Sequence, residues 1–351
     1  MRIALIATLS TPVRREGSDS IESLVWLLSR ELTRLGHDVT VFAAAGSEVH
    51  GELVATLPGP YAAAGSPTDW QVCEWVNLCR AVEQSGRFDV LHSHAYLWGL
   101  PLEDLARAPM VHTLHVCPYE NEARLWAMRP GACVTAVTAY QWSAFPTLRP
   151  AAVIHHGVDP EQFRLGPHPG DYVCYLGRFI PGKGPLQAVA AARALGLRLL
   201  LAGPRNDYFR GHVAALVDGH RVKYVGPVSG PARNELLRGA RALLYPLQEP
   251  EPFGLVQVEA MMCGTPVVAM RRGATPEIVD EGVTGYLADS PEEFAAQVDR
   301  SFGLDRRRIR ATAEERFSAG RMTEQYAELY QRLLSGEWRS ATKAESRQWQ
   351  L

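Results

Sequence analysis

The sequence lacks several patterns that mark common classes of protein. Its six cysteines include no Cys-x-x-Cys pair, so no zinc site or thiol redox centre is indicated. No stretch reaches the roughly 20 apolar residues that a membrane-spanning helix needs. The Gly-x-Gly-x-x-Gly fingerprint of a nicotinamide dinucleotide site is absent after the first predicted strand. Because the amino terminus also has too short an apolar stretch for a signal peptide, we expect a cytoplasmic protein without stable membrane insertion.

The composition is that of a globular protein too long for a single ordinary core. The 351 residues suit two domains, and 46% hydrophobic with 21% charged residues excludes a fibrous or disordered chain. A net charge of −2 gives no reason to expect a nucleic acid as partner. The charge is uneven, since residues 1–165 hold 12 Arg, no Lys and 17 acidic residues, whereas the remainder is positive. The second half therefore suits an anionic ligand better than the first.

Strands and helices alternate along the chain in two successive series, which is typical of α/β proteins with doubly wound parallel sheets. The first series begins with a continuous apolar run and a helix that ends at Gly36, and the second begins after Phe163. We expect strands at 2–8, 39–43, 90–93, 111–114, 134–137 and 153–155, then at 172–176, 197–202, 222–225, 242–245 and 267–269.

The boundaries follow from composition. Residues 164–170 hold two Pro and two Gly and are interpreted as a linker. We predict an N-terminal domain over 1–165, a C-terminal domain over 166–318, and a C-terminal helix with a polar tail over 319–351, packing back toward the first domain. The amphipathic pattern of 311–335 predicts one helix. Two such domains leave a cleft between the carboxyl ends of their strands, where ligands of these sheets bind.

The most informative stretch runs from Glu251 to Ala269 and reads EPFGLVQVEAMMCGTPVVA. Glu251 and Glu259 stand on either side of the predicted start of a helix at Leu255. Gly254 permits close approach of the backbone, and the free N–H groups of the first helical turn form an anion site. Carboxylates beside such a site suit sugar hydroxyls, from which they accept hydrogen bonds.

A second motif, Gly177–Gly184, directly follows a predicted strand and reads GRFIPGKG. Its two cations, Arg178 and Lys183, stand five residues apart in a turn rich in Gly and Pro. They can converge on one diphosphate, and the glycines let the backbone come close to it.

With both motifs at this separation, the chain resembles the family-4 retaining glycosyltransferases of the GT-B fold. The resemblance covers nearly the whole chain and is strongest from Tyr172 to Ala288. It implies two Rossmann-like domains that face each other across a cleft, the first for the acceptor and the second for the donor. The implied reaction transfers a hexose-type sugar, with retention, from a nucleotide diphosphate sugar to a hydroxyl acceptor. We favour a UDP-sugar over a GDP-sugar.

The resemblance also assigns roles to the residues of the second half. Glu251 would contact the hydroxyls of the donor sugar, and Glu259 the ribose. Arg178 and Lys183 would neutralise the charge that builds on the leaving diphosphate. The remaining donor-binding positions would be Phe253, Gly254, Leu255, Gly203, Val225 and Gly177.

No Asp-x-Asp triplet occurs in the chain, so the usual carboxylate pair of metal-dependent sugar transfer is missing. We therefore expect no metal and no cofactor, with the two fixed cations in place of the metal. The departing phosphate oxygen would deprotonate the acceptor on the same face of the sugar, so no separate base is named.

The resemblance also implies roles for positions in the first half. His115, after the predicted strand 111–114, has the place of a family histidine that faces the donor sugar. His156 stands where the family has Asn in an N-G-V-D sequence. The family usually has Gly-Gly shortly before its first helix, where this chain has Asp19 and Ser20. Residues expected on the acceptor side are Tyr119, Glu120, Trp126, His94 and Ser20.

Two alternatives remain open at this point. Another enzyme of the same fold, such as a nucleotide-sugar epimerase or an inverting transferase, shares the architecture, although an inverting enzyme needs a positioned base. A two-lobed periplasmic sugar-binding protein also consists of paired α/β domains, but that class carries a signal peptide. The acidic first half favours a neutral or cationic acceptor, whose identity the sequence leaves open.

Overall fold

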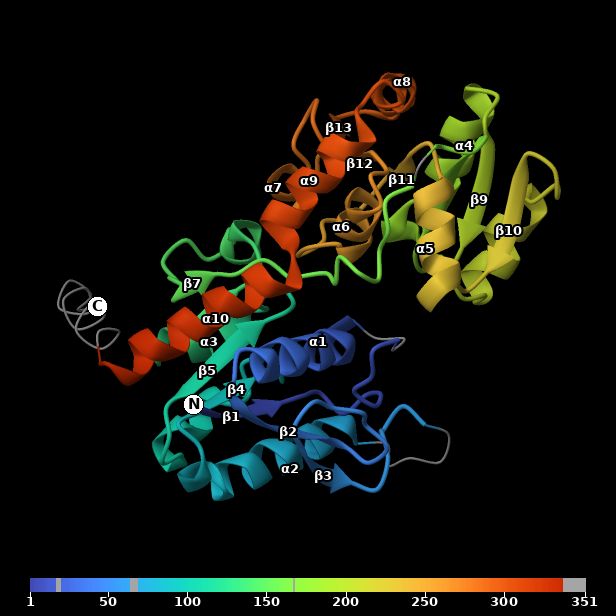
Figure 1. Ribbon diagram of the computed structural model, residues 1–351. Coiled ribbons are helices and arrows are strands. Elements are labelled where there is room, and N and C mark those ends of the chain that lie inside the picture. Colours follow the sequence, from blue (N-terminus) through green and yellow to red (C-terminus); the bar gives the residue numbers. More distant parts are fainter. Residues whose placement is uncertain (17–19, 64–68, 167, 337–351) are drawn as a thin grey trace. The chain divides into compact units, whose positions relative to one another are not determined.

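The structure, a computed structural model, describes residues 1–16, 20–63, 69–166 and 168–336. It divides into two compact units (Figure 1). Unit 1 contains Met1–Gly157 together with the chain from Ala319, and unit 2 contains Val158–Ser318. The boundary therefore lies eight residues before the predicted end of the first domain. In the described ranges no helix combines the length and apolar character needed to cross a membrane.

Unit 1 is built on a parallel sheet with the strand order β3-β2-β1-β4-β5-β6-β7. The chain leaves β1 toward β2 and β3 and then returns to β4, so the topological switch point lies between β1 and β4. The elements are β1 (Arg2–Ile6), α1 (Ser20–Arg34), β2 (Asp38–Ala44), β3 (Glu52–Leu57), α2 (Trp70–Glu83), β4 (Val90–Ser93), β5 (Met110–Leu114), α3 (Glu120–Ala127), β6 (Cys133–Ala136), β7 (Ala152–Val153) and α10 (Ala319–Leu334).

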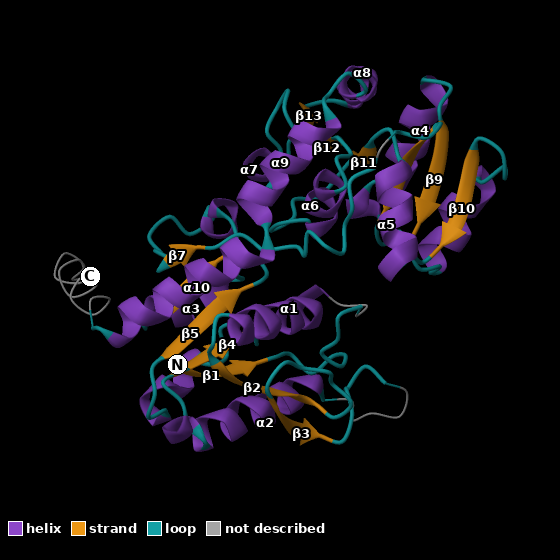
Figure 2. Cartoon of the chain, in the orientation of Figure 1, coloured by secondary structure: helices purple, strands orange, loops and turns teal. Residues whose placement is uncertain are grey.

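The core of unit 1 explains why its first helix forms. Leu24, Val25, Leu28 and Leu32 recur at helical spacing and are all buried against the sheet, together with Tyr326 of α10. Burying each such leucine contributes about 1.5–3 kcal/mol. Helices α1 and α10 share this face, whereas α2 covers the opposite face (Figure 2). The C-terminal helix thus completes the core of unit 1.

Unit 2 contains a second parallel sheet, in the order β10-β9-β8-β11-β12-β13. Its switch point lies between β8 and β11, because the chain builds outward from β8 before it returns to β11. The elements are β8 (Tyr172–Leu176), α4 (Pro185–Ala194), β9 (Arg198–Ala202), β10 (Val222–Gly226), α5 (Gly230–Gly239), β11 (Leu243–Tyr245), α6 (Leu255–Met262), β12 (Val267–Met270), α7 (Thr275–Ile278), β13 (Gly285–Ala288), α8 (Pro291–Ser301) and α9 (Arg306–Phe317).

The segment predicted as a linker, 164–170, is instead packed into unit 2 in its described part. The backbone N–H of Arg164 donates to Oδ1 of Asn234 at 2.8 Å, and that of Gly166 donates to the carbonyl of Cys263 at 3.0 Å. A Cβ atom on Gly166 would lie 2.0 Å from the carbonyl oxygen of Arg238. The glycine therefore serves close backbone packing and not flexibility, which corrects the prediction.

The predicted helix 311–335 is two helices in the structure. Ser318 separates α9 from α10 with an extended backbone, at φ −69° and ψ 148°. It pairs with Val158, whose N–H donates to the carbonyl of Phe317 at 2.8 Å. The break lets the chain pass from unit 2 back to unit 1. Strands β3 and β13 were not predicted, and β7 ends at Val153, two residues before the predicted end.

Candidate functional site

The two motifs of unit 2 meet at the switch point of its sheet. Lys183 follows β8 in a short 3₁₀ turn, Pro181–Lys183, and Glu251 follows β11. Because these strands are neighbours, their carboxyl ends bring the two side chains together. The ammonium group of Lys183 forms an ion pair with Oε1 of Glu251 and lies 5.9 Å from the centre of the Tyr245 ring. Two residues that are 68 positions apart thus form one charged centre.

Backbone contacts hold the two motifs in a fixed relation. The N–H of Gln248, in the loop after β11, donates to the carbonyl of Gly182 at 2.8 Å. Gly184 adopts φ +68°, and a Cβ atom there would lie 1.9 Å from the carbonyl oxygen of Pro246. Only glycine fits this position without a shift of the backbone. The turn that carries Lys183 is therefore locked against the loop that leads to Glu251.

Gly254 lies at the centre of a small polar cradle. It has φ +85°, and a Cβ atom there would lie 2.5 Å from Nε2 of Gln257 and 2.6 Å from the Tyr245 hydroxyl. Helix α6 starts at the next residue, and no side chain caps its first turn. Oε2 of Glu251, the Tyr245 hydroxyl and Oε1 of Gln257 are buried and lack a hydrogen-bond partner among the described residues. Such buried polar atoms indicate a place for a polar ligand.

Glu259 is the fifth residue of α6, and its side chain is buried. Its carboxylate forms an ion pair with the guanidinium of Arg233, from α5. Burial raises the pKa of Glu259, and the charge of Arg233 acts in the opposite direction. The arginine therefore helps to keep a buried carboxylate ionised and able to accept hydrogen bonds. Arg233 was not predicted, because nothing in the sequence of α5 distinguishes it from a solvated surface residue.

The predicted glycines and Val225 lie at three neighbouring strand ends. Gly177 follows β8, Gly203 follows β9, and Val225 is near the end of β10. A Cβ atom on Gly203 would lie 2.1 Å from the carbonyl oxygen of Gly177, so the backbones touch. Val225 is partly exposed, and Arg178 is exposed in the turn after Gly177. These positions form a continuous edge with the charged centre.

In unit 1, three histidines form a stacked, hydrogen-bonded row. Nδ1 of His94 lies 2.9 Å from Nε2 of His115, whose Nδ1 lies 3.4 Å from Nε2 of His156. Both pairs of rings are stacked, with centres 5.2 Å apart. The three residues follow β4, β5 and β7, so the row runs along the carboxyl edge of the sheet. His156, in the place of the family's Asn, thereby extends the row.

Burial keeps this row uncharged near neutral pH. It lowers the pKa of His115 to about 3 and holds the pKa of His94 and of His156 well below the ordinary value. Both ring nitrogens of His115 are engaged, so its one proton points either to His94 or to His156. The row therefore fixes the orientation of His115 as a neutral group.

The residues predicted on the acceptor side do not gather into one surface. Tyr119 is 78% exposed at the start of α3, and Glu120 forms an exposed ion pair with Arg124 at 2.6 Å. Trp126 is only 3% exposed and packs in the core of unit 1, so it cannot line a binding surface, and the prediction is corrected. Ser20 is the first residue of α1, and Asp19 lies outside the described residues.

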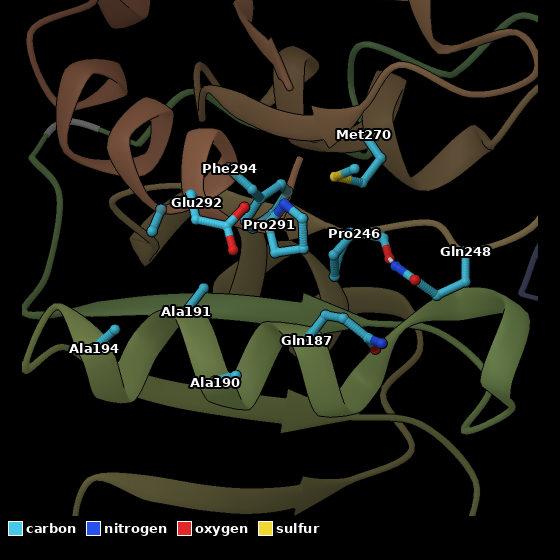
Figure 3. A pocket seen from close by; sticks show the side chains of 11 residues that line it. Gln187, Ala190, Ala191, Ala194, Pro246, Gln248, Met270, Pro291, Glu292 and Phe294 are labelled. Atoms are coloured by element: carbon cyan, nitrogen blue, oxygen red, sulfur yellow. Dashed lines mark hydrogen bonds between the residues drawn. The ribbon is translucent and has the colours of Figure 1, made fainter. Parts of the chain in front are cut away.

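A pocket of 280 Å³ lies between α4 and α8 of unit 2 (Figure 3). None of the predicted site residues lines it, and Glu292 is the one ionisable side chain among the residues that do. Pro246 and Gln248 reach it from the loop that also carries Glu251. The pocket therefore lies beside the charged centre and is separate from it. Its lining residues are Gln187, Ala190, Ala191, Ala194, Pro246, Gln248, Met270, Pro291, Glu292, Phe294 and Ala295.

Two family sequence models match adjacent parts of the chain. The family described as "Glycosyl transferases group 1" matches residues 160–316, which lie within unit 2, and "Glycosyltransferase Family 4" matches residues 21–162. The first match contains the charged centre, and the second contains the row of histidines. The D-inositol 3-phosphate glycosyltransferase of Mycobacterium tuberculosis is 29% identical, over 91% of this chain and 79% of that protein.

Solved structures show the same fold. AviGT4, a glycosyltransferase involved in avilamycin A biosynthesis, is 26% identical with a TM-score of 0.72, over 95% of this chain and 98% of that one. Sucrose-phosphate synthase from Thermosynechococcus elongatus is 21% identical with a TM-score of 0.79, over 95% and 99%. HepE of Anabaena, in complex with UDP and glucose, is 21% identical with a TM-score of 0.69, over 93% and 98%.

Proposed function

This chain belongs to the family-4 glycosyltransferases of the GT-B fold, and from that premise we propose that it transfers a hexose-type sugar from a nucleotide diphosphate sugar to a hydroxyl acceptor. Unit 2 binds the donor and unit 1 the acceptor. The observation that carries the proposal is the charged centre of Lys183 and Glu251 beside the polar cradle at Gly254.

For each part of the donor, unit 2 contains residues whose chemistry suits it. The unpartnered oxygen of Glu251, with the Tyr245 hydroxyl and Gln257, suits the hydroxyls of a hexose. The uncapped start of α6 suits the diphosphate. Glu259 suits the two ribose hydroxyls, because its carboxylate is buried and oriented by Arg233. We assign the base of the nucleotide to the strand ends at Gly203 and Val225.

In the reaction, the bond between the anomeric carbon and the phosphate oxygen breaks and a bond to the acceptor oxygen forms. Negative charge builds on the departing diphosphate, and Lys183 and Arg178 stabilise it as fixed cations. The departing phosphate oxygen takes the proton of the acceptor on the same face of the sugar, so the configuration is retained. The transfer proceeds without a metal ion in this proposal, since the two cations supply the charge.

UDP is the preferred nucleotide in this proposal. The fold is shared with HepE of Anabaena, which has been solved with UDP and with UDP-glucose, and this supports UDP over GDP. We place the reaction in the cytoplasm. The six cysteines are free thiols in the structure, which suits a reducing compartment.

Donor turnover followed by proton NMR in buffer with EDTA tests the proposal without knowledge of the acceptor. Water serves as a slow acceptor, so UDP-α-glucose should yield UDP and, first, the α-anomer of glucose. Appearance of the β-anomer first would contradict retention. A rate that depends on added magnesium or manganese would contradict metal independence.

A further inference from the structure

The switch point of the sheet in unit 1 is a second place where a ligand of a doubly wound fold binds. Two loops diverge there, one after β1 and one after β4. The loop after β1 is held by two buried carboxylates. Oε1 of Glu22 accepts hydrogen bonds from the hydroxyls of Thr8 and Ser10, at 2.8 and 2.9 Å, and Oε1 of Glu74 accepts one from the N–H of Leu9 at 2.9 Å.

Four aromatic side chains gather beside this loop. The ring of Trp70 lies 5.3 Å from that of Trp98 and 6.3 Å from those of Tyr61 and Tyr96, measured between ring centres. Tyr96 and Trp98 are stacked on each other at 5.2 Å. Trp70 is 39% exposed at the start of α2, although its ring makes all three contacts. The exposed ring of Trp70 therefore lies beside three partly buried aromatic rings at the carboxyl edge of the sheet.

Glu74 lies against this cluster. Burial raises the pKa of both Tyr61 and Tyr96, and the nearby charge of Glu74 acts in the same direction. Among the described residues, Oε1 of Glu74 accepts a hydrogen bond from the neutral N–H of Leu9, and its buried Oε2 has no hydrogen-bond partner. A buried carboxylate without a cation is costly, so this position favours a ligand that brings a positive charge.

Backbone strain marks the same place. Tyr96 has φ +50° and, in the part of the chain that the structure describes, is the sole non-glycine residue with a positive φ. Such strain is held by the surrounding structure and gathers at ligand sites. The ring of Tyr96 contacts those of Trp70 and Trp98.

We propose that the aromatic face of Tyr61, Trp70, Tyr96 and Trp98, with Glu74 beside it, is the acceptor subsite and that it takes a cyclic polyol bearing a protonated amine. The C–H face of the ring stacks on Trp70, and the ammonium group reaches Glu74 and the aromatic faces through charge and cation–π attraction. This inference rests on the proposed function, because it names the acceptor class for the same reaction.

The charge of unit 1 agrees with this assignment. Residues 1–157 contain no lysine, and the two carboxylates at the switch point, Glu22 and Glu74, repel an anionic ligand. The proposed acceptor is cationic. The name of the similar D-inositol 3-phosphate glycosyltransferases, by contrast, contains an anionic compound.

Titration of three matched sugars tests the subsite. D-glucosamine, D-glucose and D-glucose 6-phosphate are titrated calorimetrically into the full-length protein, with and without UDP. Glucosamine should bind about tenfold more tightly than glucose, and glucose 6-phosphate more weakly than either.

Glu74→Gln keeps an acceptor for the Leu9 N–H and should reduce the affinity for glucosamine to that for glucose. Trp70→Ala should weaken both sugars about equally. Glu83→Gln and Trp75→Ala, on exposed positions of the same helix, serve as controls without effect.

Equal binding of glucosamine and glucose, tighter binding of glucose 6-phosphate, or an unchanged preference in Glu74→Gln would overturn the assignment. So would the absence of binding by all three sugars while UDP still binds, an outcome that leaves the proposed function standing. Failure of UDP to bind contradicts the proposed function instead, and the titrations without UDP then decide the subsite separately. A melting curve of each variant shows that it is folded.

Discussion

The ammonium group of Lys183 and the carboxylate of Glu251 form an ion pair at the topological switch point of the sheet in unit 2, between β8 and β11. Each group neutralises the charge of the other, while Oε2 of Glu251 has no hydrogen-bond partner among the described residues. In the proposed function, we expect Lys183 to gain a phosphate oxygen as partner when a sugar diphosphate binds, and Glu251 to become available to the sugar hydroxyls. We therefore interpret the ion pair as the donor-free form of the site.

Substitution of Glu251 separates sugar binding from nucleotide binding. Glu251→Ala should lower the rate of transfer by a factor of about 10² to 10³, because a hydrogen-bond acceptor for the sugar is lost. Glu251→Gln should keep the affinity for UDP near that of the wild type. Glu235→Gln, on an exposed position of α5, is the matched control. Wild-type turnover in Glu251→Ala would refute the assigned role.

Removal of either fixed cation should slow departure of the nucleotide. We expect Lys183→Ala and Arg178→Ala each to reduce kcat by about 10² to 10³, since less charge is neutralised on the leaving diphosphate. Lys223→Ala, near the amino end of β10, should leave kcat unchanged. Steady-state assays of UDP release measure the effect. Equal losses in Lys223→Ala would show that general positive charge, and not these positions, matters.

Arg233 should control the protonation of Glu259. Without the arginine the pKa of the buried carboxyl rises further, so a larger fraction is protonated near neutral pH and cannot accept the ribose hydroxyls. Arg233→Ala should therefore bind UDP about tenfold more weakly at pH 6, and the ratio to wild type should narrow as pH rises to 8. Calorimetry at both pH values gives the ratio of the dissociation constants of variant and wild type. Protonation of UDP itself cancels in this ratio, because both proteins bind the same ligand. A ratio independent of pH would point to a purely steric role.

Gly254 should be required for its lack of a side chain as well as for its positive φ. Gly254→Ala brings a methyl group within 2.6 Å of Gln257 and Tyr245, so it should abolish UDP binding. Gly282 also has a positive φ, +77°, but a Cβ atom there would meet no described residue within 4 Å apart from its chain neighbours. Gly282→Ala thus carries the same backbone strain, about 1 kcal/mol, and should bind UDP normally. Normal binding in both variants would place the nucleotide elsewhere.

Glu74 should make the stability depend on pH in a direction unusual for a carboxyl group. Burial raises its pKa from 4.5 to about 7, so between these values the folded protein binds the extra proton and the unfolded chain does not. The free energy of unfolding therefore falls as pH rises, by about 3 kcal/mol in all. Glu74→Gln removes this loss.

The comparison of the two proteins isolates the effect. The buried histidines act in the opposite direction, because their lowered pKa values cost stability as pH falls below about 6.5. They are present in both proteins, so they cancel in the difference between wild type and Glu74→Gln. Denaturant melts at pH 5 and pH 8 give that difference. A difference that does not change with pH would show that Glu74 is ionised throughout.

The sequence allowed the two sheets and their central strands to be predicted, because strands buried on both faces read as continuous apolar runs. Strand β3 is an edge strand whose residues are exposed or only partly buried, so it lacks this signal. Trp126 was misplaced for a related reason. Three of the other seven residues of α3 are charged, yet Trp126 and Ala123 share the one buried face of that short helix.

Long-range pairs could not be predicted at all. The motifs indicated that Lys183 and Glu251 belong to one site, but their direct contact depends on β8 and β11 being neighbours. The pairing of Arg233 with Glu259 and the row through His115 likewise arise from tertiary packing.

Calorimetric titration of UDP in buffer with EDTA tests the central claim most directly, since it asks whether unit 2 holds a nucleotide diphosphate without metal. We predict saturable binding by the wild type, at least tenfold weaker binding by the double variant Arg178→Ala with Lys183→Ala, and unchanged binding by Lys223→Ala. Absence of binding by both UDP and GDP, or equal affinity in the double variant, would contradict the account.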